Sequence, residues 1–169
     1  MECKEIRPGE LQGNTFNMIG REWMLVAAGD SEAGCNAMTA SWGGMGVMWR
    51  KDVAFVVIRP QRYTKEFMDR ETRFSLSFFG KEYRKSLSWM GSVSGREEKN
   101  KMTKSGLTPV MLHGVPCFQE AETTLICRKL FAQPFDPAGF IDPAIVPEFY
   151  SGNDFHTLYI AEIEKVLIK

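Results

Sequence analysis

The sequence predicts a mainly β fold, in which an antiparallel sheet closes into a barrel and helices lie at its edges. Short apolar or alternating segments recur along the 169 residues, and clusters of turn-forming residues separate them. Few of the intervening stretches have helical periodicity, whereas parallel strands would each need a helix between them. We find no repeat, low-complexity segment or linker, so we expect one domain over residues 1–169.

The composition narrows the class of protein. Lys plus Arg is 21 and Asp plus Glu is 21, so the formal net charge is zero, whereas proteins that bind nucleic acid or membrane surfaces usually carry a basic excess. No segment approaches membrane-spanning length, and the first residues lack the apolar stretch of a signal peptide. Four scattered cysteines and two histidines have no zinc-site spacing. We therefore expect no metal site and free thiols in the cytoplasm.

The N-terminal half is expected to begin with a short helix followed by two strands. An amphipathic segment at 16–19 indicates the helix, and the apolar run 23–28 indicates the first strand. Residues 35–42 alternate small or hydroxyl side chains with larger ones, which is compatible with a strand that has one face against a ligand.

A glycine-rich segment at 43–46 follows the second strand. Three glycines in four positions indicate a backbone that either turns sharply or lies directly against a neighbour. Residues 47–49 are expected to be extended and 50–52 to form a turn. The segment lacks the Gly-Lys-Ser/Thr ending of a phosphate-binding P-loop.

The next segment combines a strand, a turn and a helix. Residues 53–58 form an unbroken apolar run, with four of its six residues β-branched, which indicates a buried strand. Pro60 has no amide donor and should end this strand. Thr64 is then expected to cap a helix over 65–69.

This turn is the first candidate for a ligand site. It would bring Arg59 and Arg62 together with free backbone N–H groups at the helix start. Guanidinium groups and such amides bind anions, and a phosphate fits best. The alternative is that both arginines are solvated and that Thr64 is an ordinary cap, because short motifs often occur by chance.

The C-terminal half is expected to hold further strands at 73–79, 108–112, 118–133 and 156–169, the last with a bulge near 161–162. Helices are expected at 83–90, with Tyr83, Leu87 and Met90 on one face, and at 97–104. Residues 91–96 are expected to form a flexible loop and 113–116 a turn. Four prolines in 133–154 disfavour long regular elements, so we expect an extended excursion with one short helix.

Several segments resemble the flavin reductase-like proteins and, among these, the flavoredoxin-like branch. Asn-Ala-Met-Thr-Ala-Ser-Trp-Gly-Gly from Asn36, a Val/Ile-rich strand and Arg-Pro-Gln-Arg-Tyr-Thr from Arg59 carry the resemblance. Phe78-Phe79, the segment 91–96 and a stretch that begins at Asp154 follow in the same order. The resemblance covers roughly residues 18–169. It implies an FMN-binding split β-barrel that forms a homodimer.

The resemblance also implies which residues hold FMN. The phosphate would meet Arg62, Tyr63 and Thr64, since a guanidinium and hydroxyl groups suit a phosphate monoester. The ring edge would lie along residues 38–42, whose backbone N–H groups and hydroxyls can donate to it. The candidate cofactor-binding residues are Asn36, Met38, Thr39, Ala40, Ser41, Trp42, Arg59, Arg62, Tyr63, Thr64, Gly91 and Ser92.

Three features leave alternatives open. Trp42 either covers the ring or fills the core, and residues 91–96 either cover the flavin or merely connect helices. His156 is the one candidate catalytic side chain, although Phe155 separates it from the Asp154 of an expected Asp-His pair. It either contacts a nicotinamide, tunes the flavin or is structural. No nucleophile is expected, because the cofactor carries the chemistry.

We therefore expect an FMN-binding oxidoreductase that passes hydride or electrons through flavin N5. A flavin reductase would take hydride from NAD(P)H, whereas a flavoredoxin-like carrier would exchange electrons with a redox protein. The chain has no dinucleotide-binding fingerprint, so a nicotinamide would stack in the open flavin cleft. The alternative is a barrel that binds FMN or another ligand without turnover.

Overall fold

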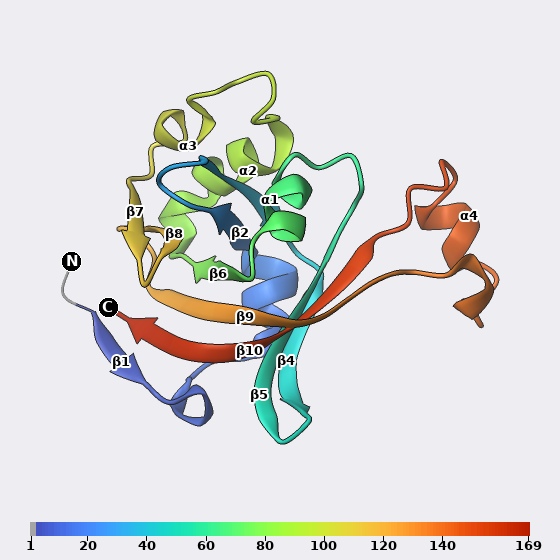
Figure 1. Ribbon diagram of the computed structural model, residues 1–169, viewed down its shortest axis with the longest axis horizontal. Helices are drawn as coiled ribbons and strands as arrows, with labels where there is room; N and C mark the ends of the chain where they lie inside the picture. The colour runs from blue at the N-terminus through green and yellow to red at the C-terminus, as the bar shows by residue number, and fades with distance from the viewer. Residues whose placement is uncertain (1–2) are drawn as a thin grey trace.

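A computed structural model describes residues 3–169, and Figure 1 shows a strongly bent sheet with helices around it. The strands are β1 (Lys4–Ile6), β2 (Met24–Gly29), β3 (Cys35–Ala40), β4 (Gly43–Met48), β5 (Lys51–Ile58), β6 (Arg73–Phe78), β7 (Pro109–Leu112), β8 (Val115–Phe118), β9 (Thr123–Pro134) and β10 (Thr157–Ile168). The helices are α1 (Thr64–Arg70), α2 (Arg84–Ser92), α3 (Lys101–Lys104) and α4 (Ile145–Phe149), together with a π-helical segment at Asn17–Glu22 and short 3₁₀ turns at Pro8–Glu10, Lys81–Tyr83 and Pro137–Gly139. The expectation about a signal peptide partly concerns residues 1–2, which lie outside the described residues.

The main sheet is antiparallel and has the strand order β3-β2-β6-β9-β10-β5-β4, with β1 also paired to β10. β7 and β8 form a separate hairpin. The sheet bends until β3, at one end, approaches β5 near the other end, and these two strands are not paired. The predicted barrel is therefore confirmed, and it is split between β3 and β5.

Two apolar clusters hold the helices against the sheet. The larger one fills the barrel and includes Phe67 and Met68 of α1, which point inward. The second lies under α2, where Leu87 and Met90 pack on Leu25 and Ala37. The predicted α2 face is confirmed, with Tyr83 only partly buried beside it. In residues 3–169 no helix is long and apolar enough to cross a membrane.

The glycine-rich segment is a strand that lies directly against its neighbour. A Cβ at Gly43 would overlap the carbonyl oxygen of Phe55, and one at Gly44 would lie 2.5 Å from the Phe55 ring. β4 can therefore pack closely on β5 because it lacks side chains there. The turn that follows lies at Trp49 and Arg50, whose φ angles of 54° and 59° are typical of a tight hairpin, and not at 50–52 as predicted.

Other predicted boundaries are wrong at four places. β3 ends at Ala40 and not at 42, because β4 begins at Gly43. α2 continues through Ser92, so Gly91 and Ser92 are helical and not part of a loop. The helix predicted at 97–104 is limited to α3, because irregular turns occupy the residues before it. The strand predicted at 118–133 begins only at Thr123, because Phe118 ends β8 and the residues between them form a turn, in which the amide of Ala121 bonds to the carbonyl oxygen of Phe118 at 3.3 Å.

The last two long strands reach beyond the rest of the sheet. Figure 1 shows β9 and β10 side by side, continuing into an arm that carries α4. Their register shifts at Ile160/Ala161, close to the predicted bulge, and again at Ile163/Lys165. The predicted excursion at 133–154 is this arm, and it holds α4 and one 3₁₀ turn.

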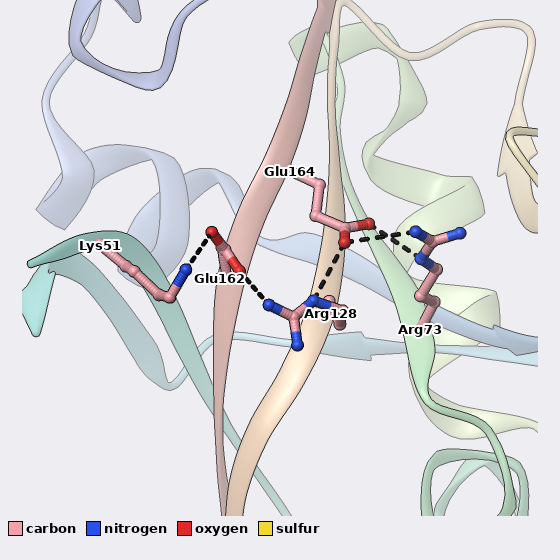
Figure 2. Close-up of polar contacts among 5 residues, drawn as sticks. All are labelled: Lys51, Arg73, Arg128, Glu162 and Glu164. Carbon is pink, nitrogen blue, oxygen red and sulfur yellow. Dashed lines mark hydrogen bonds and ion pairs between the residues drawn. The ribbon is translucent and has the colours of Figure 1, made fainter. Parts of the chain in front are cut away.

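A network of ion pairs links side chains of β5, β6, β9 and β10 on the outside of the sheet (Figure 2). Glu162 pairs with Lys51 at 2.8 Å and with Arg128. Glu164 pairs with Arg128 at 3.1 Å and with Arg73 at 2.8 Å. Each charge in this outer network has an opposite charge beside it.

Candidate functional site

A cavity of about 280 Å³ lies in the split of the barrel. β3 and the two residues after it form one wall, and the end of β5 with the start of β10 forms the other. Its lining residues are Met38, Thr39, Ala40, Ser41, Trp42, Val57, Arg59, Arg62 and His156. The structure thus brings together most of the residues that the sequence predicted for the ring.

The free edge of β3 faces this cavity. β3 is the terminal strand of the sheet, so half of its backbone groups have no partner strand. The ammonium of Lys101 donates to the carbonyl oxygen of Ala37 at 2.8 Å, which identifies Ala37 as a residue whose backbone points away from β2. Because antiparallel pairing alternates, the backbone groups of Thr39 point the same way. These groups can bind the polar edge of a planar ligand.

The Thr39 hydroxyl has a different role from the one predicted. It donates to the carbonyl oxygen of Leu87 in α2, so its proton is not available to a ligand. A Cβ at Gly91 would lie 3.3 Å from the Cβ of Thr39, so the last turn of α2 packs closely on β3 there. Ser92 likewise donates back to the carbonyl oxygen of Ser88 at 3.0 Å. Thr39 therefore fixes α2 against β3.

A second, smaller cavity of about 120 Å³ adjoins the first, and Arg62 lines both. Its other lining residues are Asn36, Gln61, Tyr63, Thr64, Gly91, Ser92, Val93, Ser94, Gly95 and Lys101. Neither Arg62 nor Lys101 belongs to any ion pair in the part of the chain that the structure describes. Two cations thus share a cavity without an acidic partner, which is an arrangement that suits an anion.

Lys101 is the most buried of these charges, with 2% of its surface exposed. Burial and the nearby charge of Arg62 lower the pKa of Lys101 from 10.5 to about 8. Burial also lowers the pKa of Arg62. A bound anion would offset the repulsion between Arg62 and Lys101, and it would give the buried ammonium of Lys101 an opposite charge. Lys101 is the first residue of α3, and no sequence signal distinguishes it from the charged residues around it.

Thr64 does not cap α1 as predicted. Its side chain makes no capping bond, and it is the first residue of the helix after Tyr63. Its hydroxyl instead accepts a bond of 2.9 Å from the buried amide of Asn36, so its own proton is free to donate into the smaller cavity.

The amides at the start of α1 are partly occupied. The amides of Lys65 and Glu66 bond to the carbonyl oxygens of Arg62 and Tyr63, at 3.0 and 3.1 Å. Side chains, more than free amides, therefore make this cavity attractive to an anion.

Arg59 and Arg62 leave the predicted turn in different directions. The Arg62 amide bonds to the Arg59 carbonyl oxygen at 3.1 Å, which closes a turn with Pro60 in its second position. The Arg59 guanidinium, however, pairs with Asp154 and donates to the carbonyl oxygen of Phe149 at 2.8 Å. Arg59 thus ties the arm to the barrel. Of these two arginines, it is Arg62 that has no acidic partner in residues 3–169.

His156 lies between Trp42 and Tyr150. Its ring centroid is 5.1 Å from that of Trp42, and its Nδ1 is 2.8 Å from the Tyr150 hydroxyl. Burial, and then the charge of Arg59, lower the pKa of His156 to about 4. The imidazole is therefore neutral at physiological pH. Asp154 pairs with Arg59 and accepts a hydrogen bond from Gln61, and within residues 3–169 it makes no hydrogen bond to His156.

The family model described as the flavin reductase like domain matches residues 16–169. No curated protein sequence gives a significant match. Many solved structures are similar to this chain in fold. An FMN-binding domain of a flavin reductases-like enzyme from Shewanella baltica OS155 has a TM-score of 0.70 at 16% identity, over 99% of this chain and 77% of that one.

Two others are a flavoredoxin and an FMN-binding protein. Flavoredoxin from Methanosarcina acetivorans has a TM-score of 0.68 at 18% identity, over 88% of this chain and 68% of that one. An FMN-binding protein from Thermus thermophilus has a TM-score of 0.68 at 23% identity, over 97% of this chain and 82% of that one. Because the family model spans nearly the whole chain, and the split barrel agrees with it, this protein belongs to the flavin reductase like domain family.

Proposed function

We propose that the protein is an FMN-binding oxidoreductase of the flavin reductase or flavoredoxin type, with residues 1–169 as one flavin-binding domain. The observation that carries the proposal is the pair of cations Arg62 and Lys101, which lack an acidic partner in residues 3–169 and lie beside the free edge of β3. Three similar structures are named as FMN-binding or flavoredoxin proteins, which agrees with this. When bound, FMN supplies hydride and electron transfer through its N5 atom.

The smaller cavity suits the phosphate of FMN. A phosphate monoester carries about −1.5 to −2 charge near pH 7, which Arg62 and Lys101 together balance. The Thr64 hydroxyl, oriented by Asn36, can donate a further bond. Tyr63, Gly91 and Ser92 complete the walls.

The larger cavity suits the ring. The backbone N–H of Thr39 at the strand edge can donate to the polar edge of the ring, and Met38, Ala40 and Ser41 line the same cavity. Trp42 and His156 flank the cavity. Because His156 is neutral, we expect it to position the ring or a substrate through hydrogen bonding and not to act as an imidazolium acid.

The electron donor is either NAD(P)H or a redox protein, and the acceptor is a second small molecule or protein. The first test is the absorbance spectrum of the purified protein, recorded without oxygen before and after addition of NADH or NADPH. A yellow protein that bleaches supports a flavin reductase. A yellow protein that stays oxidised supports a carrier. A colourless protein that takes up no FMN contradicts the proposal and leaves only the barrel.

We also propose that the protein is a homodimer. Large apolar side chains are exposed on the β4–β5 hairpin and on the arm, including Val47, Trp49 and Ile141, the last with 98% of its surface exposed. Such side chains on two projecting segments suit an interface between copies. Light scattering during size-exclusion chromatography should give twice the mass of 19.2 kDa. A mass of one chain at micromolar concentration would contradict the dimer.

A cytoplasmic location is part of the proposal. Cys3, Cys35, Cys117 and Cys127 are all free thiols, and burial raises the pKa of the Cys35 and Cys117 thiols. Free, unreactive thiols suit a reducing compartment. Fractionation of the cells that make the protein would test this directly.

A further inference from the structure

The segment between α2 and α3, residues 93–100, closes one side of the phosphate cavity, and we call it the strap. We propose that the strap selects flavin mononucleotide over flavin dinucleotide, and that Arg96 is the residue that holds it closed. This inference rests on the proposed function and names the residue that determines which flavin the site accepts.

The strap touches the opposite wall of the cavity directly. A Cβ at Gly95 would overlap Oδ1 of Asn36 and would lie 2.9 Å from Cδ1 of Tyr63. The strap backbone can approach this closely only because Gly95 has no side chain. Val93, Ser94 and Gly95 thus form one wall, and Asn36 and Tyr63 form the wall that they meet.

Arg96 does not line the phosphate cavity but joins its two walls from outside. Its guanidinium donates to the carbonyl oxygen of Gln61 at 3.1 Å and pairs with Glu66 of α1. The same group lies 5.0 Å from the centre of the Tyr63 ring. All three partners belong to the turn and helix that carry Arg62, so Arg96 fastens the strap to the wall opposite it.

A much larger cavity lies on the far side of the Gly95 contact. It has a volume of about 460 Å³ and shares Asn36, Tyr63 and Gly95 with the phosphate cavity. This volume falls within the range of about 300–1,000 Å³ that is typical of small-molecule pockets. An adenylate group attached to the phosphate would have to cross the Gly95 contact to reach it. While Arg96 holds the strap in place, the phosphate cavity ends at the Gly95 contact.

The charges in the phosphate cavity also favour FMN. Arg62 and Lys101 present two positive charges, which match the terminal phosphate of a mononucleotide. In a dinucleotide the same phosphate is part of a diphosphate, in which each phosphate carries one charge, and the second phosphate would have to lie beyond the closed wall, away from Arg62 and Lys101. The closed wall and the placement of the charges together favour FMN over FAD.

The test compares flavins on the full chain after bound flavin has been dialysed away. Dissociation constants for FMN, FAD and riboflavin are measured by flavin fluorescence for the wild type and for Arg96→Ala. Glu66→Gln removes the same ion pair from the other wall. Arg73→Ala is the matched control, because Arg73 is a similarly exposed, paired arginine far from the strap.

We expect the wild type to bind FMN about 100-fold more tightly than FAD, the scale of one or two charge-assisted contacts. Arg96→Ala and Glu66→Gln should narrow this ratio about tenfold, with faster release of FMN in stopped-flow measurements, and Arg73→Ala should leave it unchanged. Melting temperatures within a few degrees of the wild type would show that the variants fold.

Three results would overturn the inference. Equal affinity of the wild type for FMN and FAD would show that the strap does not select. An FMN-to-FAD ratio that stays unchanged in both strap variants would remove Arg96 as the residue that fastens it. Failure to bind any flavin, or equal binding of FMN and riboflavin, would overturn the phosphate cavity itself and with it the proposed function.

Discussion

Two groups of charged side chains in this protein differ in how their charges are balanced. The outer network of Lys51, Arg73, Arg128, Glu162 and Glu164 lies half exposed on the sheet, and every member has an opposite charge beside it. The cations Arg62 and Lys101 lie at the cavity and have no acidic partner in the described residues. The charges of the outer network balance one another, whereas the charges of Arg62 and Lys101 would be balanced only by an anionic ligand.

The two groups differ in what the loss of one charge should cost the protein. An exposed pair gains little, usually about 0–1 kcal/mol, and loses little when it is broken. A buried, unpaired ammonium is costly to the folded chain, so its presence calls for a compensating interaction. Substitutions in the two groups should therefore differ in their effects on FMN affinity and on the free energy of unfolding, and the following experiments measure both.

The largest effect is expected for Lys101→Met. Removing this cation should weaken FMN binding about 100-fold, because a desolvated charge contact contributes about 2–5 kcal/mol. The flavin-free protein should be no less stable than the wild type, since the substitution removes a buried charge and keeps an apolar chain of similar length. Titration of FMN together with urea unfolding of the flavin-free protein measures both quantities.

Lys104→Met provides the control on the same helix. Lys104 is exposed and pairs with Glu98, so its loss should change neither quantity appreciably. If Lys101→Met kept its FMN affinity, the cavity would not be the phosphate site.

The second effect is expected for Arg62→Ala. Loss of this guanidinium should weaken FMN binding about 30-fold, near 2 kcal/mol, the scale of a hydrogen bond to a charged group. Riboflavin has no phosphate, so its affinity should fall much less. Arg59→Ala should instead shift both flavins equally, because Arg59 holds the arm through Asp154. An unchanged FMN dissociation constant would remove Arg62 from the site.

The third effect is a pH dependence of FMN affinity. Lys101 has a pKa of about 8 in the flavin-free protein, and a bound phosphate would raise that pKa. FMN affinity should therefore be greatest between about pH 6, where the phosphate loses its second proton, and pH 8. Above pH 8 it should fall by up to tenfold per pH unit, and Lys101→Met should abolish this fall.

The same pKa predicts the stability of the flavin-free protein. Between pH 8 and 10.5 the unfolded chain keeps a proton on Lys101 that the folded chain has lost. The unfolded state binds more protons there, so stability contributed by this group should rise with pH over that window. The prediction would be wrong if the free energy of unfolding fell over this pH window in the wild type but not in Lys101→Met.

Sequence reasoning succeeded where the determinants are local. The apolar run at 53–58, the Pro60 turn and the alternation at 73–79 predicted β5, its end and β6, because strand patterns and proline act within a few residues. The resemblance then identified the wall formed by residues 38–42.

The same reasoning failed where distant segments meet. Lys101 enters the cavity only because α2 and the strap carry it back to Ala37 of β3, 64 residues away in sequence. Asn36 holds the Thr64 hydroxyl across 28 residues, so local capping chemistry gave the wrong partner for Thr64. Thr39 is a predicted site residue whose hydroxyl is already bonded to α2. The pairing of Arg59 with Asp154 likewise needs the whole arm to be in place.

The smallest effect is expected in the outer network, for Glu164→Gln. Glu164 pairs with both Arg73 and Arg128, but all three side chains contact water, so the free energy of unfolding should fall by only about 1 kcal/mol. The difference from wild type should shrink at about 1 M salt, where the screening length is only about 3 Å. FMN affinity should not change, because the network lies outside the sheet. Glu164→Gln could instead weaken FMN binding as much as Lys101→Met does. That result would mean that the two groups of charges are coupled through β9 and β10. The distinction between a network that balances its own charges and a site balanced by its ligand would then fail.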